Sequence, residues 1–476
     1  MGQGCAAVLD VGKTVTKLSL WSPDGRLLDR RARANTPQST SAYPALDAEG
    51  IAEWLAQELA AFARSETIAA IVPVAHGAAA VIVDDDGSYL PPMDYEAELP
   101  PALREGYLAQ RDPYAVTGSP CLPAGLNLGA QLHWLDAIAP ERARAGRIVT
   151  WPQFWAWLLS GVPSAEVSSL GSHTDLWCPM QGCPSPLAVA RGWAERLAPL
   201  RHACDVLGRV APAWRDRCTL PDDCTVLCGM HDSNAALLAS RLYPEVQNGD
   251  FTVLSTGTWF VAMRALPHDR AADLSGLSET RDCLVNVDVH GTPVPSSRFM
   301  GGREVEIIED FAGTPANVAV QGEALLRRAA RLIEQGVFAL PAFQPGVGPY
   351  PHAAAHWSAR PDDPLDRRAA ASLYLALMAD ASLDLIGSRE RLIVEGRFAD
   401  DATFVRALAA LRPAQPVFVA GMTDNVPLGA LHLVHPKLQP CGSLTAVQPL
   451  PNDLTGYARQ WRSLAERPAS ARRAHA

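Results

Sequence analysis

The chain has 476 residues, of which 48% are hydrophobic and 19% are charged, ordinary values for a globular protein with a large core. This length predicts two large domains, or one domain with insertions. The formal net charge of −10 argues against a general nucleic-acid or anionic-membrane surface, so any phosphate must be met by locally placed donors.

The cysteines and the start of the chain favour a cytoplasmic protein without a membrane partner. Ten cysteines are scattered along the chain, and we interpret Cys228, in an apolar run, as a buried free thiol. We find no apolar run of the roughly 18 residues that a membrane helix needs, and no signal-peptide pattern. Residues 1–6 resemble a myristoylation motif, but Ala6 stands where that motif requires Ser or Thr.

The chain opens with two strands that enclose a glycine loop. An apolar run at residues 6–9 predicts a buried strand, and alternation over residues 16–21 predicts a second one. The loop between them ends in Gly12-Lys13-Thr14, as a P-loop does. The P-loop motif, however, needs Gly where this chain has Ala7, and a helix after the Thr. Because a hairpin is predicted here, we reject the P-loop.

Helices and strands then alternate up to the middle of the chain. The Asp run at residues 84–86 predicts a solvated hairpin tip and not a metal site. Residues 91–112 are irregular, and residues 166–177 are polar and broken by glycine, unlike a core element. Apolar spacing predicts helices over residues 51–62, 131–135 and 154–159, and strands over residues 68–74 and 80–83.

A carboxylate near the middle of the chain is a candidate general base. An apolar run ends at Gly229, and His231 and Asp232 then open an alanine-rich helix. Asp is a favoured N-cap, so this residue can be no more than a helix cap. Alternatively, a carboxylate beside a phosphate site acts as the base for an attacking hydroxyl, because phosphoryl transfer depends on such positioning.

The first glycine loop has a partner half a chain away. Residues 8–14 and 253–259 share two apolar residues, a short polar residue, a Gly and a hydroxyl, which predicts two related lobes that each offer one loop to a shared cleft. A loop of this type presents backbone N–H groups and a hydroxyl to phosphates, and the Asp10 carboxylate can stand close to their metal ion. The alternative is two tight turns that share Gly and Thr by chance.

The remaining pattern predicts an α/β protein with two lobes. We expect lobes at residues 1–245 and 246–450 and a C-terminal tail at residues 451–476, disordered from Glu466. The second half shows strands over residues 284–289, 337–342, 391–394 and 417–420, helices over residues 368–386, 404–411 and 426–433, and a glycine turn at residues 298–303.

Four motifs, in this order and spacing, resemble the FGGY carbohydrate kinases over residues 6–433. They are Asp10-x-Gly12-x-Thr14-x-Thr16-Lys17, Gly229-x-His231-Asp232, Ser255-Thr256-Gly257-Thr258-Trp259 and Glu395-Gly396. The central motif is most similar to a rhamnulokinase-like branch. The resemblance implies two duplicated ribonuclease H-like lobes of the actin-like ATPase fold with a central nucleotide cleft. It also implies ATP and Mg²⁺ as cofactors, a small-molecule sugar as substrate, no nucleic-acid partner and a homodimer.

The resemblance also implies roles for individual residues. Asp232 is expected to be the general base on the sugar hydroxyl, and Asp10 to help hold Mg²⁺. Gly396 is expected to pack against the nucleotide base. The two phosphate loops are formed by Gly12, Lys13 and Thr14, and by Thr256, Gly257 and Thr258. The residues expected to face the sugar are His76, Gly77, Glu166, His173, Thr174 and His231.

Several residues depart from the family pattern. Lys13 replaces the usual Thr or Ser of the first loop, and Glu395 replaces a Gly of the adenosine motif. Met93-Asp94-Tyr95-Glu96 stands where many members have Trp-x-Asp-x-Arg, and the pattern near Gln131 keeps Trp134 but loses its Lys. We therefore predict intact catalytic parts and altered sugar recognition.

Two functional hypotheses follow. In the first, the protein transfers the γ-phosphoryl group of ATP to a hydroxyl of a ketose or deoxyketose, such as a rhamnulose-like sugar. In the second, it is a catalytically weakened nucleotide-binding sensor or regulator of the same fold, which Lys13 and Glu395 favour. Asp10 and Asp232 favour the kinase. Lys13 is predicted to contact the phosphates as a point charge, or else to point into solvent.

Overall fold

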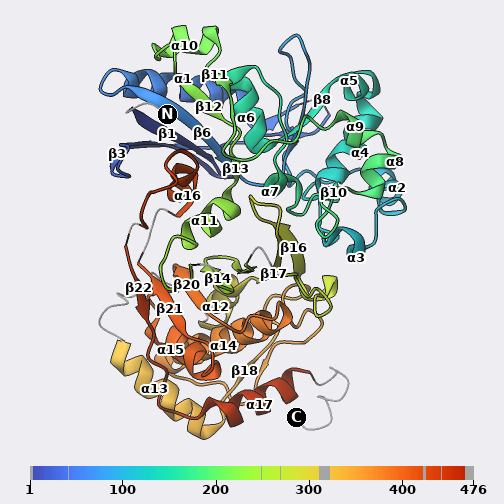
Figure 1. The fold of residues 1–476 in the computed structure, drawn as a ribbon. Helices are drawn as coiled ribbons and strands as arrows, with labels where there is room; N and C mark the ends of the chain where they lie inside the picture. Colours follow the sequence, from blue (N-terminus) through green and yellow to red (C-terminus); the bar gives the residue numbers. More distant parts are fainter. Residues whose placement is uncertain are drawn as a thin grey trace. The chain divides into compact units, whose positions relative to one another are not determined.

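The computed structural model describes residues 4–40, 42–247, 249–267, 270–309, 322–421, 425–440 and 442–466 (Figure 1). The chain divides into two compact units. Unit 1 comprises Met1–Leu242, Val285–Pro293 and Asp424–Cys441, and unit 2 comprises Tyr243–Leu284, Val294–Thr423 and Gly442–Ala476. The expected lobe boundaries at residues 245 and 450 stay predictions.

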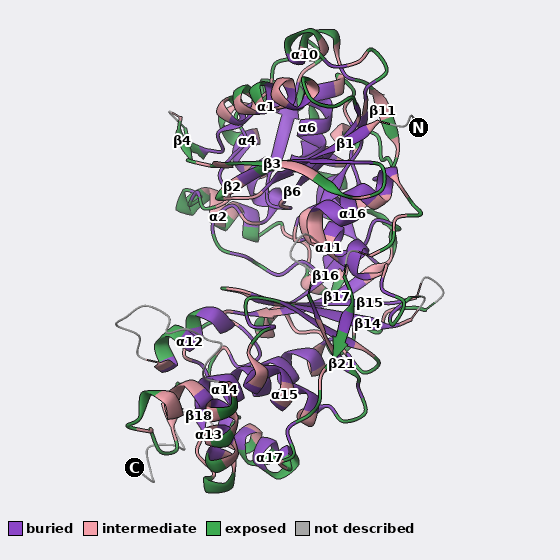
Figure 2. Cartoon of the chain, turned by 90° about the vertical axis from the view of Figure 1, so that its left-hand side faces the viewer, coloured by how far each residue is buried: buried purple, intermediate pink, exposed green. Residues whose placement is uncertain are grey.

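Unit 1 is built on a mixed sheet whose central strand ends in the first glycine loop. Its strands are β1 (Cys5–Val11), β2 (Val15–Trp21), β3 (Leu27–Ala34), β6 (Ile68–Ala75), β11 (Val206–Arg209), β12 (Thr225–Leu227) and β13 (Met230–His231). The order is β11-β12-β6-β1-β2-β3, and β13 also pairs with β6. β1 is buried along its whole length, which its almost entirely apolar sequence allows (Figure 2). It runs antiparallel to β2, which confirms the hairpin and the rejection of a P-loop.

Helices of unit 1 bury apolar stripes against this sheet and against each other. α1 buries Ile51, Leu55, Leu59 and Phe62 on one face, the spacing that predicted it. The helices are α1 (Ala48–Ala63), α2 (Pro101–Leu108), α3 (Tyr114–Thr117), α4 (Leu128–Ile138), α5 (Pro140–Ala145), α6 (Trp151–Ser160), α7 (Val167–Leu170), α8 (Pro186–Ala190), α9 (Trp193–Arg196), α10 (Pro212–Cys218), α11 (Asp232–Ser240) and α16 (Asn425–Val434). Short strands β4 (Gln38–Ser39), β5 (Pro44–Ala45), β7 (Ala80–Val83), β8 (Arg147–Thr150), β9 (Trp177–Cys178) and β10 (Cys183–Pro184) form two-stranded ribbons.

Unit 2 holds a second mixed sheet, covered by its own helices. The sheet contains β14 (Phe251–Thr256), β15 (Phe260–Ala265), β16 (Cys283–Val287), β17 (Pro293–Phe299), β20 (Leu392–Gly396), β21 (Val417–Ala420) and β22 (Leu444–Ala446), in the order β16-β17-β15-β14-β20-β21-β22. The other elements are the 3₁₀ helix η1 (Glu279–Arg281), the ribbon of β18 (Ala339–Leu340) and β19 (His356–Trp357), and the helices α12 (Gly301–Glu309), α13 (Gly322–Gln335), α14 (Pro364–Leu385), α15 (Ala402–Leu411) and α17 (Leu454–Ala465).

The two sheets repeat one topology. In unit 1, β1, β2 and β3 form an antiparallel meander, and β6 and then β12 lie parallel beside β1. In unit 2, β14, β15 and β17 form the meander, and β20 and then β21 lie parallel beside β14. Each glycine loop joins the first two strands of its meander. The predicted duplication of an α/β lobe is therefore confirmed.

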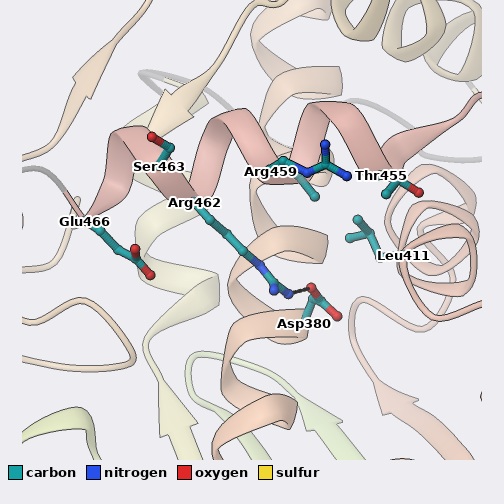
Figure 3. A pocket seen from close by; sticks show the side chains of 8 residues that line it. Asp380, Leu411, Thr455, Arg459, Arg462, Ser463 and Glu466 are labelled. Carbon is teal, nitrogen blue, oxygen red and sulfur yellow. Dashed lines mark hydrogen bonds and ion pairs between the residues drawn. The ribbon is translucent and has the colours of Figure 1, made fainter.

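Helix α17 packs onto unit 2 within the range that we expected to be a tail. Trp461 is fully buried, and its Nε1 donates a hydrogen bond of 2.7 Å to the carbonyl of Ala339. Figure 3 shows Arg462 reaching from this helix to Asp380 on α14, with which it forms an ion pair. A polar hollow of about 710 Å³ lies beside this pair. The expected disorder beyond Glu466 falls on residues 467–476, which lie outside the described residues.

Three predictions of local structure were wrong. Residues 91–112 contain α2, and the expected glycine turn at residues 298–303 is the junction where β17 ends and α12 begins. Residues 166–177 belong to the core, with Ser168, Ser169 and Leu170 all buried. The Asp run at residues 84–86 does lead into an exposed turn, and Cys228 is a buried free thiol, as predicted. In the described part of the chain, every helix is too short or too polar to span a bilayer.

Candidate active site

The Asp10 carboxylate lies at the end of the central strand of unit 1. In the register of the sheet, Asp10 stands opposite Lys17 of β2 and beside Val74 of β6. Its Oδ2 lies 3.7 Å from the Nζ of Lys17. Burial and then the negative charge of Asp232 raise the pKa of Asp10 to about 6, against the opposing effect of Lys17. Asp10 and Asp232 therefore belong to one electrostatic site.

The first glycine loop is closed by backbone contacts and held by a residue that we did not predict. The N–H of Gly12 donates to the carbonyl of Val15 at 3.1 Å. Asn35 lies just after β3. Its side-chain amide donates to the carbonyl of Gly12 at 2.8 Å, and its backbone N–H donates to the carbonyl of Thr14 at 2.8 Å. Its Oδ1 accepts from the hydroxyl of Thr16 at 2.9 Å. Asn35 thus fixes the loop while Thr14 stays exposed.

Lys13 extends from this loop to residues 94–96. Its ammonium forms an ion pair with Asp94, lies 3.5 Å from Oε2 of Glu96, and sits 4.6 Å from the centre of the Tyr95 ring. Only 15% of its side chain is exposed, so it does not point freely into solvent. Contact between Lys13 and phosphates stays a prediction.

Asp232 begins helix α11 and is oriented by its neighbours. Asn234 Nδ2 lies 3.2 Å from His231 Nδ1, which therefore accepts the hydrogen bond. Burial lowers the pKa of His231 to about 4, so the ring is neutral at pH 7 and carries its proton on Nε2. This Nε2 lies 3.2 Å from Asp232 Oδ1. Oδ1 accepts from the N–H of Ser233 at 2.5 Å.

The contacts just described all fall on Oδ1 of Asp232. The side chain keeps 28% of its surface exposed. Burial of the carboxylate nevertheless raises the pKa of Asp232 to about 6. A carboxylate with this pKa is ionised at neutral pH and is a stronger base than an ordinary Asp.

His76 and Gly77 lie against His231. Gly77 leaves room for this contact, because a Cβ atom there would stand 2.8 Å from Ser172 Oγ and 3.0 Å from His231 Nε2. His76 Nδ1 accepts a hydrogen bond from the N–H of Ala78 at 3.3 Å. Burial, and then repulsion from His231 in its protonated form, lowers the pKa of His76 to about 3, so His76 is neutral at pH 7 as well.

Glu166, His173 and Thr174 make contacts within the fold. Glu166 is fully buried and caps α7, accepting from the N–H groups of Ser168 and Ser169 at 2.9 and 3.1 Å. Burial raises its pKa to about 7. His173 Nδ1 lies 2.9 Å from the carbonyl of Leu126. The buried hydroxyl of Thr174 donates to the backbone carbonyl of Leu170 at 2.5 Å. Their contact with a sugar stays a prediction.

Glu166 does connect to the Asp232 region. The Oγ of Ser168 donates to Glu166 at 2.6 Å and accepts from the backbone N–H of His231 at 3.3 Å. Glu166 therefore stabilises the backbone at His231 indirectly, through the hydroxyl of Ser168. No motif in the sequence predicted this chain of contacts, because it depends on the burial of residues 166–177.

Unit 2 carries the second glycine loop and Gly396 side by side. Thr256 pairs with Gly396 in the register of β14 and β20. The hydroxyl of Thr256 is buried, donates to the carbonyl of Glu395 at 2.5 Å and accepts from the N–H of Phe398 at 3.0 Å. Thr258 is exposed. If this loop binds phosphate, Thr256 contributes structure while Thr258 offers a hydroxyl to solvent.

The residues of unit 1 fit a hard cation only in part. Among the described residues no group of three or more His, Cys, Asp or Glu side chains is arranged to hold a metal ion. Mg²⁺ in nucleotide sites is bound through one or two carboxylates together with phosphate oxygens and water. Asp10 and Asp232 are compatible with that arrangement, because a cation near them would relieve the repulsion between their negative charges.

Comparison with known proteins identifies the family. The family model described as the carbohydrate kinase FGGY C-terminal domain matches residues 248–440. A solved structure of a carbohydrate kinase from Novosphingobium aromaticivorans is 47% identical, covers 97% of this chain and 100% of its own, and superposes with a TM-score of 0.93. No curated protein matches the chain.

More distant structures share the fold. A xylulose kinase from Rhodospirillum rubrum is 17% identical, covers 97% of this chain and 98% of its own, and has a TM-score of 0.75. A glycerol kinase from Plasmodium falciparum is 14% identical, covers 98% of each chain, and has a TM-score of 0.74. Both lobes of this chain therefore have the actin-like ATPase fold predicted from the motifs.

The chain belongs to the FGGY family of carbohydrate kinases. This family consists of ATP-dependent sugar kinases, so the predicted enzyme class and the predicted family are confirmed. The rhamnulokinase-like branch stays a prediction.

Proposed function

We propose that the protein transfers the γ-phosphoryl group of ATP to a hydroxyl of a small sugar, a ketose or deoxyketose such as a rhamnulose-like sugar, with Asp232 as the general base. The observation that carries the proposal is the state of the Asp232 carboxylate. Its Oδ1 accepts from the N–H of Ser233 at 2.5 Å and lies 3.2 Å from Nε2 of neutral His231, while burial raises its pKa to about 6. The N-cap position of α11 is occupied by His231, so Asp232 does not serve as the cap.

The chemistry assigned to Asp232 is a single proton transfer. Oδ2 accepts the proton of the sugar hydroxyl as its oxygen bonds to the γ-phosphorus of ATP, and the bond from that phosphorus to the bridging oxygen of ADP breaks. Ser233 orients the carboxylate through its N–H and hydroxyl, and the nearby His231, being neutral, does not compensate its charge. Positioning of this kind is the main contribution that a protein makes to phosphoryl transfer.

We assign the phosphate and metal contacts as follows. The loops at residues 12–14 and 256–258 bind the phosphates of ATP through the exposed hydroxyls of Thr14 and Thr258 and through backbone N–H groups other than those of Gly12 and Gly257, which are bonded within their loops. Gly396 packs against the adenosine. Asp10 helps to hold Mg²⁺, which supplies positive charge to the transferring phosphates when it is bound. Support comes from the burial of Asp10 at the strand end beside the first loop.

A screen of ketoses, aldoses and polyols for sugar-dependent release of ADP tests the proposal. The expected result is at least one sugar that raises ADP release far above the rate without sugar, with Asp232→Asn lowering that rate roughly 10²- to 10⁴-fold. ATP binding by the purified protein together with no sugar-dependent turnover across the screen would instead support the sensor or regulator hypothesis.

A further inference from the structure

Lys13 departs from the family pattern, and its contacts in the structure point away from a role as a plain phosphate ligand. Its ammonium is shared between Asp94, which is 3% exposed, and Glu96, which is 69% exposed. It also lies over the Tyr95 ring at 4.6 Å, within cation–π range. The charge of Lys13 is therefore balanced within unit 1 by two carboxylates.

The partner of Lys13 is rigidly placed. Asp94 Oδ1 accepts from the backbone N–H of Glu96 at 2.9 Å, and the backbone N–H of Asp94 donates to the carbonyl of Pro44 at 2.9 Å. Met93 forms a bridge with Ala45. Since Asp94 is fixed by these contacts, the ion pair anchors the first glycine loop to residues 93–96, and equally holds the Asp94 carboxylate in one orientation.

This ion pair stands among the groups that surround Asp232. The Tyr95 ring meets His76 edge-on, with 5.4 Å between ring centres. His76 is followed by Gly77, whose missing side chain makes room for His231, and His231 Nε2 lies 3.2 Å from Asp232 Oδ1. Lys13, Tyr95 and His76 therefore lie in one cluster whose next neighbours along the chain surround Asp232.

We propose that Lys13 is a specificity-determining residue for the phosphoryl acceptor: with Asp94 it forms a charge-balanced pair that hydrogen-bonds the hydroxyls of an uncharged sugar or polyol and disfavours a sugar acid. This inference rests on the proposed kinase function. A carboxylate accepts hydrogen bonds from sugar hydroxyls, and an ammonium donates to their oxygens. A substrate carboxylate gains little here, because Lys13 is already neutralised and Glu96, Asp94 and Asp232 repel it.

The first test separates the acceptor from the nucleotide. Lys13→Met removes the charge and keeps the length of the side chain. It should raise KM for the best neutral acceptor roughly 10- to 100-fold, the range for one charge-assisted hydrogen bond, and leave KM for ATP within about twofold. Arg142→Met is the matched control: it deletes one cation of unit 1 that pairs with Asp84 at 2.8 Å near the exposed turn, and should change neither KM. A rise in KM for ATP with an unchanged acceptor KM would overturn the assignment.

Folding of the variant can be controlled independently. Lys13→Met leaves a nearly buried carboxylate without its partner, so Lys13→Met/Asp94→Asn, which removes both charges, is prepared beside it. Calorimetric titration with Mg²⁺ and a non-hydrolysable ATP analogue should give the same affinity for wild type and the double variant, within about twofold. An affinity weakened tenfold would show that Lys13 serves the nucleotide, and this readout decides the point even if no acceptor is found.

The second test varies the charge of the acceptor. Wild type is assayed with neutral ketoses and polyols and with aldonates of the same chain length. Neutral acceptors should exceed aldonates at least tenfold in kcat/KM. Aldonate turnover equal to that of the neutral compounds would overturn the inference while leaving the kinase function intact. Absence of turnover with every acceptor would count against the kinase function itself.

Discussion

The glycine loop at the end of β1 is held from outside, whereas the loop at the end of β14 is held by one of its own residues. Asn35 clamps the first loop through hydrogen bonds to Gly12, Thr14 and Thr16. The second loop is tied to the neighbouring strand by the buried hydroxyl of Thr256. The repeat aligns Thr256 with Val11, which is buried and apolar and cannot make such bonds.

The difference extends to the chemistry of the two units. Unit 1 places titratable groups at its loop, since Asp10 and Asp232 both have a pKa of about 6 and neutral His231 lies 3.2 Å from Asp232. At the position of Asp10, unit 2 has Ser255, and its loop offers hydroxyls and backbone groups. Hydroxyls and amides bind phosphates but do not accept protons at neutral pH. Under the proposed function, the duplication has therefore given one lobe to proton transfer and the other to recognition.

The largest effect that this comparison predicts is at Asp232. Asp232→Asn keeps the shape of the side chain and removes its basicity, so kcat should fall roughly 10²- to 10⁴-fold while KM for ATP changes little. Steady-state kinetics with both substrates measures this. A variant with near-normal kcat would leave Asp232 with a structural role only, as the first residue of α11, and remove the contrast between the two units.

The second prediction concerns pH, which should change the protonation of the two carboxylates in unit 1 but not of the hydroxyls and amides in the unit 2 loop. Because burial raises the pKa of Asp232 to about 6, kcat/KM should fall about tenfold per pH unit below 6 as the base becomes protonated, and about a hundredfold per unit if Asp10, whose pKa is also about 6, must be ionised as well. A raised carboxyl pKa means that the folded state binds the proton more tightly than the unfolded state. These two groups therefore add stability as the pH falls from 6 toward 4.

Activity and stability should thus diverge in this window. Thermal melting of the protein between pH 7 and pH 5 distinguishes titration from acid unfolding. Parallel loss of folded protein and of kcat/KM would contradict the assignment of the pH effect to the two carboxylates.

The third prediction compares two glycines. Gly396 has φ +86°, and a Cβ atom there would lie 2.3 Å from the carbonyl oxygen of Thr256. Gly396→Ala should therefore cost about 3 kcal/mol of folding free energy. At Gly12 the nearest atom to such a Cβ is the carbonyl oxygen of Val15 at 2.9 Å, so Gly12→Ala should cost about 1 kcal/mol. Chemical denaturation measures both, and equal costs would contradict the tighter packing of the second loop.

Local sequence patterns were sufficient to predict the repeated framework. An apolar run followed by a polar residue, Gly and a hydroxyl predicts a buried strand and its loop, because burial and turn chemistry act within a few residues. The same locality places Asp232 at the start of α11, where the structure finds it.

Contacts between distant residues were not predictable in this way. Lys13 and Asp94 are 81 residues apart, and Asn35 meets Gly12 only because the register of β2 and β3 brings them together. Residues 166–177 looked too polar for a core, yet Glu166 is satisfied inside it by the serines that follow it. Polarity alone does not predict exposure, because a polar side chain can be buried when it finds hydrogen-bond partners inside the fold.

The smallest predicted effect tests the clamps themselves. Thr256→Val keeps the shape of the side chain but removes the buried hydroxyl that bonds the carbonyl of Glu395 and the N–H of Phe398, which should cost about 1–3 kcal/mol. Asn35→Ala should cost less, about 0.5–1.5 kcal/mol, because water can reach the half-buried carbonyls that Asn35 releases. Urea denaturation of both variants measures the difference.

As a control, Asn35→Asp keeps the acceptor for Thr16 and loses the donor to Gly12, so its stability should fall between those of wild type and Asn35→Ala. If Asn35→Ala were instead more damaging than Thr256→Val, the first loop would depend on its clamp more than the second does. The energetic order of the external and internal clamps would then be the reverse of the one proposed.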